Sequence, residues 1–289
     1  MRPLEGPLTG KVAVVTGASR GIGKGTACVL AEQGATVYVT ARTVNAGENP
    51  LPGTIGETIA EIERRGGKAI GVALDLHDDD AIGALFAQVK SEQGRLDIHV
   101  NNAMAIPESM TSKAPFWEKP LADEWDIWNT GLRAAFIASH HAAKIMAPQG
   151  SGLIACMSGY VGRTYTYDVM FGTTKTATDR MARDMGVELK PHGVASVSLW
   201  QGFTYTERAI ENLKTVPGMA SQLNSAVGSS PEFVGRVIAA LAIAPDLMSR
   251  TGGSWIVAEL AAAYGVTDID GRTIPSLREE RGSPIFGPV

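Results

Sequence analysis

Long hydrophobic runs, cysteines and blocks of like charge are scarce in this chain of 289 residues. No apolar run is long enough to span a bilayer, and the opening MRPLEGPLTGK lacks the apolar centre of a secretory signal. The two cysteines, Cys28 and Cys156, lie in apolar stretches, which favours small core residues in a reducing compartment over a disulfide framework. These absences predict a soluble, cytoplasmic protein.

Charge is also balanced along the chain. The 26 basic and 30 acidic residues leave a net charge of −4, and neither sign is concentrated in one block. This argues against a nucleic-acid surface and against attachment to anionic lipid. A hydrophobic fraction of 44% with 19% charged residues is typical of a globular protein with a buried core.

Short β-branched runs alternate with longer segments of helical period. Strands are predicted at 11–16, 35–40, 68–74, 96–100, 152–157, 193–200 and 253–258, and helices at 22–33, 54–66, 78–93, 122–147, 170–190 and 231–243. Apolar strands that alternate with helices predict an α/β fold, a doubly wound parallel sheet of about seven strands with helices on both faces. We predict a single domain, 1–289, with a core of about 8–258, a long connection at 201–230 that could form an active-site lid, and a surface tail at 259–289.

The stretch VVTGASRGIG, residues 14–23, follows the first strand and opens the first helix. Gly17 would allow the tight turn, Gly21 would let the backbone approach a pyrophosphate, and Gly23 would permit close packing of helix and sheet. The start of the helix then offers N–H groups to an anion. A glycine triplet alone is a weak signal, but its place between a strand and a helix predicts a dinucleotide site.

The T-G-x-x-x-G-x-G spacing of this stretch resembles that of the short-chain dehydrogenase/reductases, and the resemblance extends over about 8–258. It implies a Rossmann fold and a cofactor site that includes Ser19, Arg20 and Ile22 beside the glycines. Further along the chain, Asp75 with Leu76 matches the adenine contact, Asn102 and Ala103 in VNNA match the ribose side, and Thr206 resembles the threonine at the nicotinamide carboxamide. KAPFWEKP, SLWQG and YGVTDIDGR are similar to the dehydrogenase/reductase member-one branch of this family.

The end of the second strand, VTAR, carries Arg42 where an NAD-dependent member would have an acid. Arg20 adds a second positive charge in the glycine loop. A guanidinium suits a phosphate because it donates two parallel hydrogen bonds. NADP is therefore the expected cofactor, with NAD less favoured.

The family's catalytic set is Asn, Ser, Tyr and Lys, with Tyr and Lys four residues apart on one helix face. Here Lys175 is present, but Phe171 stands at the Tyr position. A phenylalanine ring cannot transfer a proton, and positioned acid–base catalysis contributes typically ~10²–10⁴ in rate. We therefore expect an intact cofactor cradle beside an altered proton-transfer site, in which Lys175 can still hold the ribose.

Two further catalytic positions depart from the family pattern. The Asn position falls on Gly131, and Asn129, two residues earlier, lies on another helix face. For the Ser, counting forward from Gly152 selects Gly159, whereas counting back from Phe171 selects Ser158. Ser158 is the candidate we favour, since it is the hydroxyl available, but both remain open.

Several other residues could suggest chemistry. Tyr165, Tyr167 and Asp168 precede Phe171, and Tyr205 lies on the long connection; we interpret the tyrosines as loop aromatics around the pocket rather than replacement acids. The aspartates of HDDDA, 77–81, are expected as helix caps and first-turn charges. No metal site is predicted.

Two hypotheses follow. The first is an NADP(H)-dependent oxidoreductase with an atypical active site, whose small-molecule substrate would be an unidentified small or medium apolar carbonyl or alcohol. The second is a dinucleotide-binding sensor or assembly subunit without turnover. Whether Phe171 is the natural residue or an introduced one is open, as is the substrate. The resemblance also implies a homodimer or homotetramer formed through the helices at 122–147 and 170–190.

Overall fold

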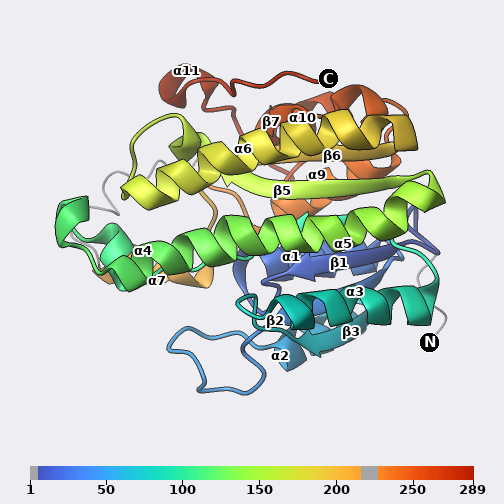
Figure 1. Cartoon of the computed structure of the whole chain (residues 1–289), viewed down its shortest axis with the longest axis horizontal. Coiled ribbons are helices and arrows are strands. Elements are labelled where there is room, and N and C mark those ends of the chain that lie inside the picture. Colours follow the sequence, from blue (N-terminus) through green and yellow to red (C-terminus); the bar gives the residue numbers. More distant parts are fainter. Residues whose placement is uncertain (1–5, 216–226) are drawn as a thin grey trace. The chain divides into compact units, whose positions relative to one another are not determined.

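A computed structural model of the chain describes residues 6–215 and 227–289 (Figure 1). Seven strands form one sheet in the order β3-β2-β1-β4-β5-β6-β7, and the pairs β1–β2, β2–β3 and β4–β5 are parallel. The strands are β1 Val12–Thr16, β2 Thr36–Ala41, β3 Lys68–Ala73, β4 Ile98–Asn101, β5 Gly152–Gly159, β6 Val194–Gln201 and β7 Ser254–Ile256. The predicted doubly wound α/β fold is confirmed.

By internal contacts the chain divides into two compact units, each made of three stretches. Unit 1 comprises Met1–Ala73, Gln201–Pro245 and Ile256–Leu277, and unit 2 comprises Leu74–Trp200, Asp246–Trp255 and Arg278–Val289. The expectation of a single domain stays a prediction.

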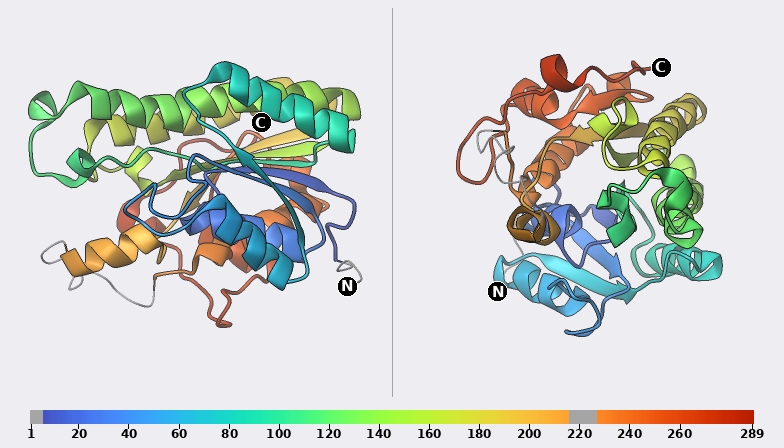
Figure 2. Two further views of the ribbon diagram at one scale, coloured as in Figure 1. Left: turned by 90° about the horizontal axis from the view of Figure 1, so that it is seen from below. Right: turned by 90° about the vertical axis from the view of Figure 1, so that its left-hand side faces the viewer.

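Unit 1 holds β1, β2 and β3 with the helices α1 Gly21–Glu32, α2 Ile55–Arg64, α7 Glu207–Thr215, α9 Pro231–Ile243 and α10 Val257–Tyr264. Helix α1 packs along α9 with α2 beside it (Figure 2). The approach is close because a Cβ at Gly25 would lie 2.3 Å from the carbonyl of Pro231. Helix α2 is capped by Thr54, whose hydroxyl accepts from the N–H of Glu57 at 3.0 Å.

Unit 2 holds β4 and β5 with α3 Asp79–Gln93, α4 Leu121–Trp128, α5 Ala134–Gln149, α6 Val169–Leu189 and the short α11 Arg278–Arg281. Helices α4 and α5 lie in line, joined by a π-helical turn at Asn129–Arg133, and α6 runs beside α5 (Figure 1). Helix α3 is capped by Asp78, whose carboxylate accepts from the N–H of Ala81 at 3.0 Å. The predicted capping role of the HDDDA aspartates is therefore confirmed.

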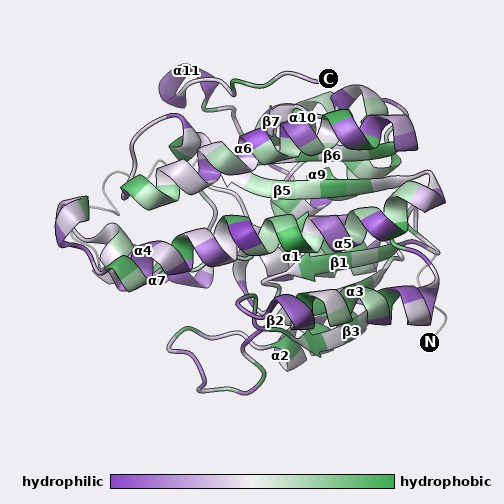
Figure 3. Cartoon of the chain, viewed as in Figure 1, coloured by the Kyte–Doolittle hydropathy of each residue, from purple (hydrophilic) through white to green (hydrophobic). Residues whose placement is uncertain are grey.

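The burial of the strands follows their hydropathy. Every residue of β1 is buried, and β1 and β5 are largely hydrophobic in Figure 3. A strand that is apolar on both faces is typical of the interior of a parallel sheet. Both cysteines are free and buried, which confirms their interpretation as core residues.

The structure corrects three boundaries. The helix predicted at 122–147 is interrupted by the π-helical turn, the connection at 201–230 contains α7, and the strand predicted at 253–258 ends at Ile256, where α10 follows. Residues 216–226 of the predicted lid lie outside the described residues. Within the described ranges, no helix has both the length and the hydropathy needed to cross a membrane.

Candidate functional site

The glycine loop at the carboxyl end of β1 has the geometry that its sequence predicts. Gly17 and Gly21 have φ values of 66° and 56°, in the left-handed region that favours glycine. The loop is fixed from two sides, since the Ala18 N–H donates to the Thr40 carbonyl at 2.9 Å and the Thr58 hydroxyl donates to the Ala18 carbonyl at 2.9 Å. This rigid turn leads directly into the N-terminus of α1.

Arg20, the residue before α1, is directed toward the 43–53 loop. Its Nε donates to the Pro52 carbonyl and its Nη2 to the Gly53 carbonyl, each at 2.9 Å, and Nη2 also lies 3.3 Å from the Thr43 hydroxyl. A guanidinium has five N–H donors, so the Nη1 donors remain for a ligand. Arg20 therefore orders the loop that follows β2 while keeping capacity for a phosphate.

Arg42, at the end of β2, is exposed. Within the described part of the chain it has no ion pair or hydrogen bond with another side chain. An unpaired guanidinium can turn to an anionic ligand without breaking an existing bond.

Thr206 and Glu207 lie directly against the first residue of α1. A Cβ at Gly21 would be 3.2 Å from Cγ2 of Thr206 and 3.8 Å from Oε2 of Glu207. The Gly21 N–H donates to that Glu207 oxygen at 2.8 Å. The structure thus brings Gly21 and Thr206, two predicted cofactor residues, together within unit 1, with a carboxylate that the sequence analysis did not predict.

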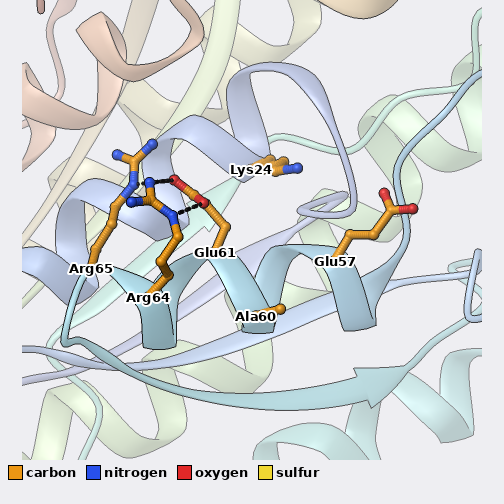
Figure 4. A pocket seen from close by; sticks show the side chains of 6 residues that line it. All are labelled: Lys24, Glu57, Ala60, Glu61, Arg64 and Arg65. Atoms are coloured by element: carbon orange, nitrogen blue, oxygen red, sulfur yellow. Dashed lines mark hydrogen bonds and ion pairs between the residues drawn. The ribbon is translucent and has the colours of Figure 1, made fainter.

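A surface hollow between α1 and α2 carries several charges of both signs (Figure 4). It is lined by Lys24, Glu57, Ala60, Glu61, Arg64 and Arg65. Glu61 pairs with Arg64 at 2.7 Å and with Arg65 at 2.6 Å, and Arg65 also reaches Glu232 of α9 at 3.1 Å. Because its arginines are already neutralised, this hollow is an ion-pair network joining helices rather than a place for an anionic ligand.

In unit 2, the predicted adenine contact Asp75 is part of a three-residue chain of polar groups. Its carboxylate accepts from the N–H of His77 at 3.0 Å and lies 2.9 Å from Nδ1 of the same imidazole. Nε2 of His77 is 2.8 Å from Asp126 of α4. Leu76 contributes its carbonyl to Arg133 at 2.7 Å. The loop after β3 is thereby tied to the helix pair α4–α5.

Asn102 and Ala103 follow β4 and are partly buried. Gly131, the residue predicted at the family's Asn position, lies in the π-helical turn, where a Cβ would be 3.0 Å from Thr174 and 3.4 Å from Met104. π-helical turns are frequent at functional sites. Here the space that a longer side chain would need is occupied by Met104 and Thr174.

Phe171 is held at the start of α6 by the cap residue Asp168. The Asp168 carboxylate accepts from the N–H groups of Met170 at 2.7 Å and Phe171 at 3.4 Å. It is buried, pairs with Lys119 and forms a hydrogen bond with Glu124. Burial raises the pKa of Glu124, and the contact with Asp168 raises it further. Burial would also raise the pKa of Asp168, but its hydrogen bonds, led by the one from Lys119, lower it below the usual value. This buried cluster fixes the first turn of α6.

Lys175 lies one turn beyond Phe171 and is buried. Its Nζ donates to the Met157 carbonyl at 2.8 Å and lies 5.9 Å from the centre of the Phe171 ring. Burial lowers the pKa of Lys175 to about 8, although the charge of Asp179 acts in the opposite direction. The structure therefore places an ammonium beside the ring of Phe171, the residue that the sequence analysis predicts at the Tyr position.

Asp179, one further turn along α6, is also buried. It accepts from the Ser198 hydroxyl and from the indole N–H of Trp200, which is 3.0 Å from each carboxylate oxygen. Burial raises the pKa of Asp179, opposed by these hydrogen bonds and by the charge of Lys175. Cys156 completes the group, and burial raises the pKa of its thiol to about 11.

Ser158 and Gly159, the two candidates for the Ser position, end β5. The Ser158 side chain is fully buried, and its hydroxyl lies 3.1 Å from the carbonyl of Lys175. Gly159 has an extended backbone and no side chain to orient a substrate. The assignment of either residue to that position stays a prediction.

The neighbouring tyrosines precede α6 rather than belong to it. Tyr165 and Tyr167 are 80% and 43% exposed, and the Tyr167 ring is centred 6.3 Å from Phe171. Tyr167 has a φ of 69°, unusual for a residue other than glycine. On the other unit, Tyr205 packs edge-on against Phe203 at 5.3 Å. This agrees with their interpretation as loop aromatics.

Sequence reasoning did not identify Lys119, Asp179 or Glu207 as parts of these groups. Asp179 could have been found, because it follows Lys175 by four residues and so shares its helix face. Glu207 is separated from Gly21 by 186 positions, and neither helical nor strand periodicity connects them.

The sequence was compared with family models and with known proteins. Residues 11–216 match the family model described as short chain dehydrogenase. Dehydrogenase/reductase SDR family member 1 of Mus musculus is 39% identical over 279 residues, 93% of this chain and 86% of that protein. The Homo sapiens protein of the same name is 37% identical over 280 residues, 94% and 87% of the two chains.

Solved structures agree with this match. A short-chain type dehydrogenase/reductase from Mycobacterium marinum has a TM-score of 0.73 at 28% identity, covering 86% of this chain and 94% of that one. A structure assigned as an NAD(P) dependent gluconate 5-dehydrogenase from Beutenbergia cavernae, with NADP bound at low occupancy, has a TM-score of 0.74 at 25% identity and covers 86% of this chain and 96% of that one. The fold, the glycine turn and the extent of these matches lead to one conclusion: the chain belongs to the short-chain dehydrogenase family.

Proposed function

We propose that the protein is an NADP(H)-dependent oxidoreductase that interconverts a carbonyl and an alcohol, with an atypical proton-transfer site. The observation that carries the proposal is the glycine turn between β1 and α1, joined to Thr206 at Gly21. Family membership supports the reaction class, because the matched model extends from the first strand through the catalytic helix α6.

The residues of each unit suit a dinucleotide. In unit 1, the N-terminus of α1 offers N–H groups to a pyrophosphate, and Arg42 and the Nη1 donors of Arg20 are available for a 2′-phosphate. In unit 2, Asp75, Asn102, Ala103 and Lys175 are the residues that would meet the adenosine and nicotinamide ribose. A bound nicotinamide would supply or accept the hydride. The preference for NADP over NAD rests on the two arginines, Arg20 and Arg42, because solved structures of similar fold contain either NADP or NADH.

The proton is the unusual part of the proposed reaction. Phe171 holds the ring position but carries no ionisable group, and Nζ of Lys175 lies 5.9 Å from the centre of its ring. At neutral pH a pKa of about 8 leaves this amine mostly protonated and makes it a stronger acid than an ordinary lysine. We propose that Lys175 is the source of the proton, which reaches the substrate oxygen through water.

A second candidate function is favoured by Phe171 itself. A sensor or an assembly subunit would bind the dinucleotide without turning it over. Such a protein requires the cofactor-binding residues but not the tyrosine hydroxyl that Phe171 lacks. Retention of Lys175 is compatible with this role, since the ammonium can still hold the ribose.

Fluorescence titration with NADPH and NADH tests the cofactor, with Arg42→Ala as the variant that should weaken NADPH binding more than NADH binding. Steady-state assays with aldehydes, ketones and quinones then compare the wild-type protein with Phe171→Tyr. We expect the Tyr variant to reduce carbonyls about 10²–10⁴ times faster, the usual contribution of a positioned acid. Phe171→Leu serves as the matched control, because it changes the ring without adding a hydroxyl.

The outcomes separate the two functions. Turnover by the wild-type protein that is lost in Lys175→Met supports proton transfer from the amine. NADPH binding without turnover in the wild-type protein supports the sensor. A protein that binds neither dinucleotide would refute the cofactor assignment itself.

A further inference from the structure

We infer that Glu207 is a resident anion in the pyrophosphate cradle, and that its carboxylate competes with the phosphates of the cofactor for the N-terminus of α1. The inference rests on the proposed dinucleotide function, and it names a residue that controls how tightly the protein binds the cofactor. The contact that carries it is the 2.8 Å hydrogen bond from the Gly21 N–H to Oε2 of Glu207.

The position of this carboxylate is that of a ligand anion. The first N–H groups of a helix have no acceptor within the helix and carry partial positive charge. In α1, the cap residue Arg20 makes no side-chain cap, and the first turn contains no acidic residue. The anion that the helix start requires therefore comes from Glu207, from the segment after β6.

Two further observations place Glu207 in the cradle itself. Its Oε2 would be 3.8 Å from a Cβ at Gly21, the glycine whose missing side chain lets a pyrophosphate approach the backbone. Its charge also acts on Arg20, where it opposes the lowering of the Arg20 pKa by burial. The carboxylate thus accepts from an N–H group that a phosphate would use, and its charge acts on the guanidinium that a phosphate would meet.

The backbone around Glu207 is anchored independently of this contact. Thr204 pairs with Ser229 in a short β-bridge, the Tyr205 N–H donates to the Ser229 carbonyl at 3.0 Å, and the Thr206 hydroxyl caps the N–H of Ala209 at 3.2 Å. These bonds hold residues 204–206 without the Glu207 side chain. A ligand phosphate can therefore displace the carboxylate by rotation of one side chain.

The test measures the binding of NADPH and of inorganic pyrophosphate by calorimetry to the wild-type protein and to Glu207→Gln. Removing the resident charge should lower the Kd of both ligands about tenfold. This corresponds to ~1.4 kcal/mol, within the range for an anion at a helix N-terminus. Glu211→Gln is the matched control, because Glu211 lies on the same helix and pairs with Lys214 rather than with α1. It should leave both affinities unchanged.

Thermal unfolding in the absence of ligand distinguishes competition from simple capping. Competition predicts a lower Tm for Glu207→Gln together with tighter binding of both ligands. Unchanged or weaker binding, with or without a lower Tm, would overturn the inference and leave Glu207 as a helix cap. Equal tightening by Glu211→Gln would also overturn it, since a general charge effect would then suffice. If neither protein binds either ligand, the proposed function fails instead, and the inference with it.

Discussion

Lys175 carries two roles in the proposed site, and both depend on its protonation. Burial lowers its pKa to about 8, and the charge of Asp179, one turn along α6, partly restores it. Asp179 is in turn held by Ser198 and Trp200. Cys156 also interacts with this pair, and its thiol stays neutral near pH 8 because burial raises its pKa to about 11.

The first prediction concerns Asp179→Asn. Because the lysine is charged below its pKa and neutral above it, loss of the neighbouring carboxylate should move the Lys175 midpoint below 8, by roughly one unit. NMR titration of ¹³Cε-labelled lysine, with the signal assigned through Lys175→Arg, measures this midpoint directly. Any carbonyl reduction that uses the ammonium should decline as the pH rises through the same midpoint, and earlier in the variant.

Asp184→Asn provides the control for that titration. Asp184 lies on α6 as well, but it is exposed and pairs with Arg180. Its substitution should leave the Lys175 midpoint in place. A midpoint that does not move in Asp179→Asn, or that moves upward, would show that the carboxylate is not the counterion of Lys175.

Single residues of the site were predictable where a motif fixes the backbone. Gly17 and Gly21 have the left-handed conformation expected of the turn, and Thr206 lies on Gly21. The polar contacts of the site were not predictable. Glu207 contacts Gly21, and Lys119 pairs with Asp168, only because the fold brings distant parts of the chain together. Periodicity describes neighbours within an element, and these contacts join different elements.

At the scale of elements, two helical glycines, one on α1 and one on α2, have opposite surroundings. A Cβ at Gly25 would lie 2.3 Å from the backbone of Pro231, so the helices must separate to accept it. Gly56, on α2, has only the Thr54 hydroxyl nearby, at 3.9 Å, an ordinary contact. The same substitution should therefore have opposite effects at these sites.

We predict that Gly25→Ala lowers the free energy of unfolding by about 1–3 kcal/mol through overpacking. Gly56→Ala should raise it by roughly 0.5–1 kcal/mol, because alanine loses less backbone entropy in a helix. Urea denaturation followed by circular dichroism measures both. Destabilisation of similar size at the two positions would mean that helix packing at Gly25 is looser than described.

Element boundaries were predictable where local signals mark them. Helix α9 runs from Pro231 to Ile243 as expected, with Ser230 before it and proline at its first position. The π-helical turn within 122–147 has no comparable signal, since its residues Asn129–Arg133 continue the helical pattern. Helix α10 was assigned in part to a strand, because a short apolar run such as VAELAAAY fits either structure.

At the scale of the whole molecule, two exposed apolar side chains indicate where another copy could bind. Phe136 of α5 and Val187 of α6 are 56% and 55% exposed, on helices that run side by side (Figure 1). The resemblance to the family implies association through these same two helices. Stable interfaces bury roughly 800 Å² on each partner and exclude charge from their centre, so a carboxylate on either helix should oppose association.

The last prediction is that Phe136→Glu shifts the protein from a dimer or tetramer to a smaller species, as measured by size-exclusion chromatography with light scattering. Ile269→Glu is the matched control, because Ile269 is 60% exposed but lies on neither helix. It should leave the mass unchanged. A wild-type protein that is monomeric at all concentrations, or a Phe136→Glu variant of unchanged mass, would contradict the assignment of α5 to the interface.

Binding of NADPH to the Phe136→Glu variant then decides whether the cofactor site requires association. An unchanged affinity in the smaller species would mean that each copy holds a complete dinucleotide site.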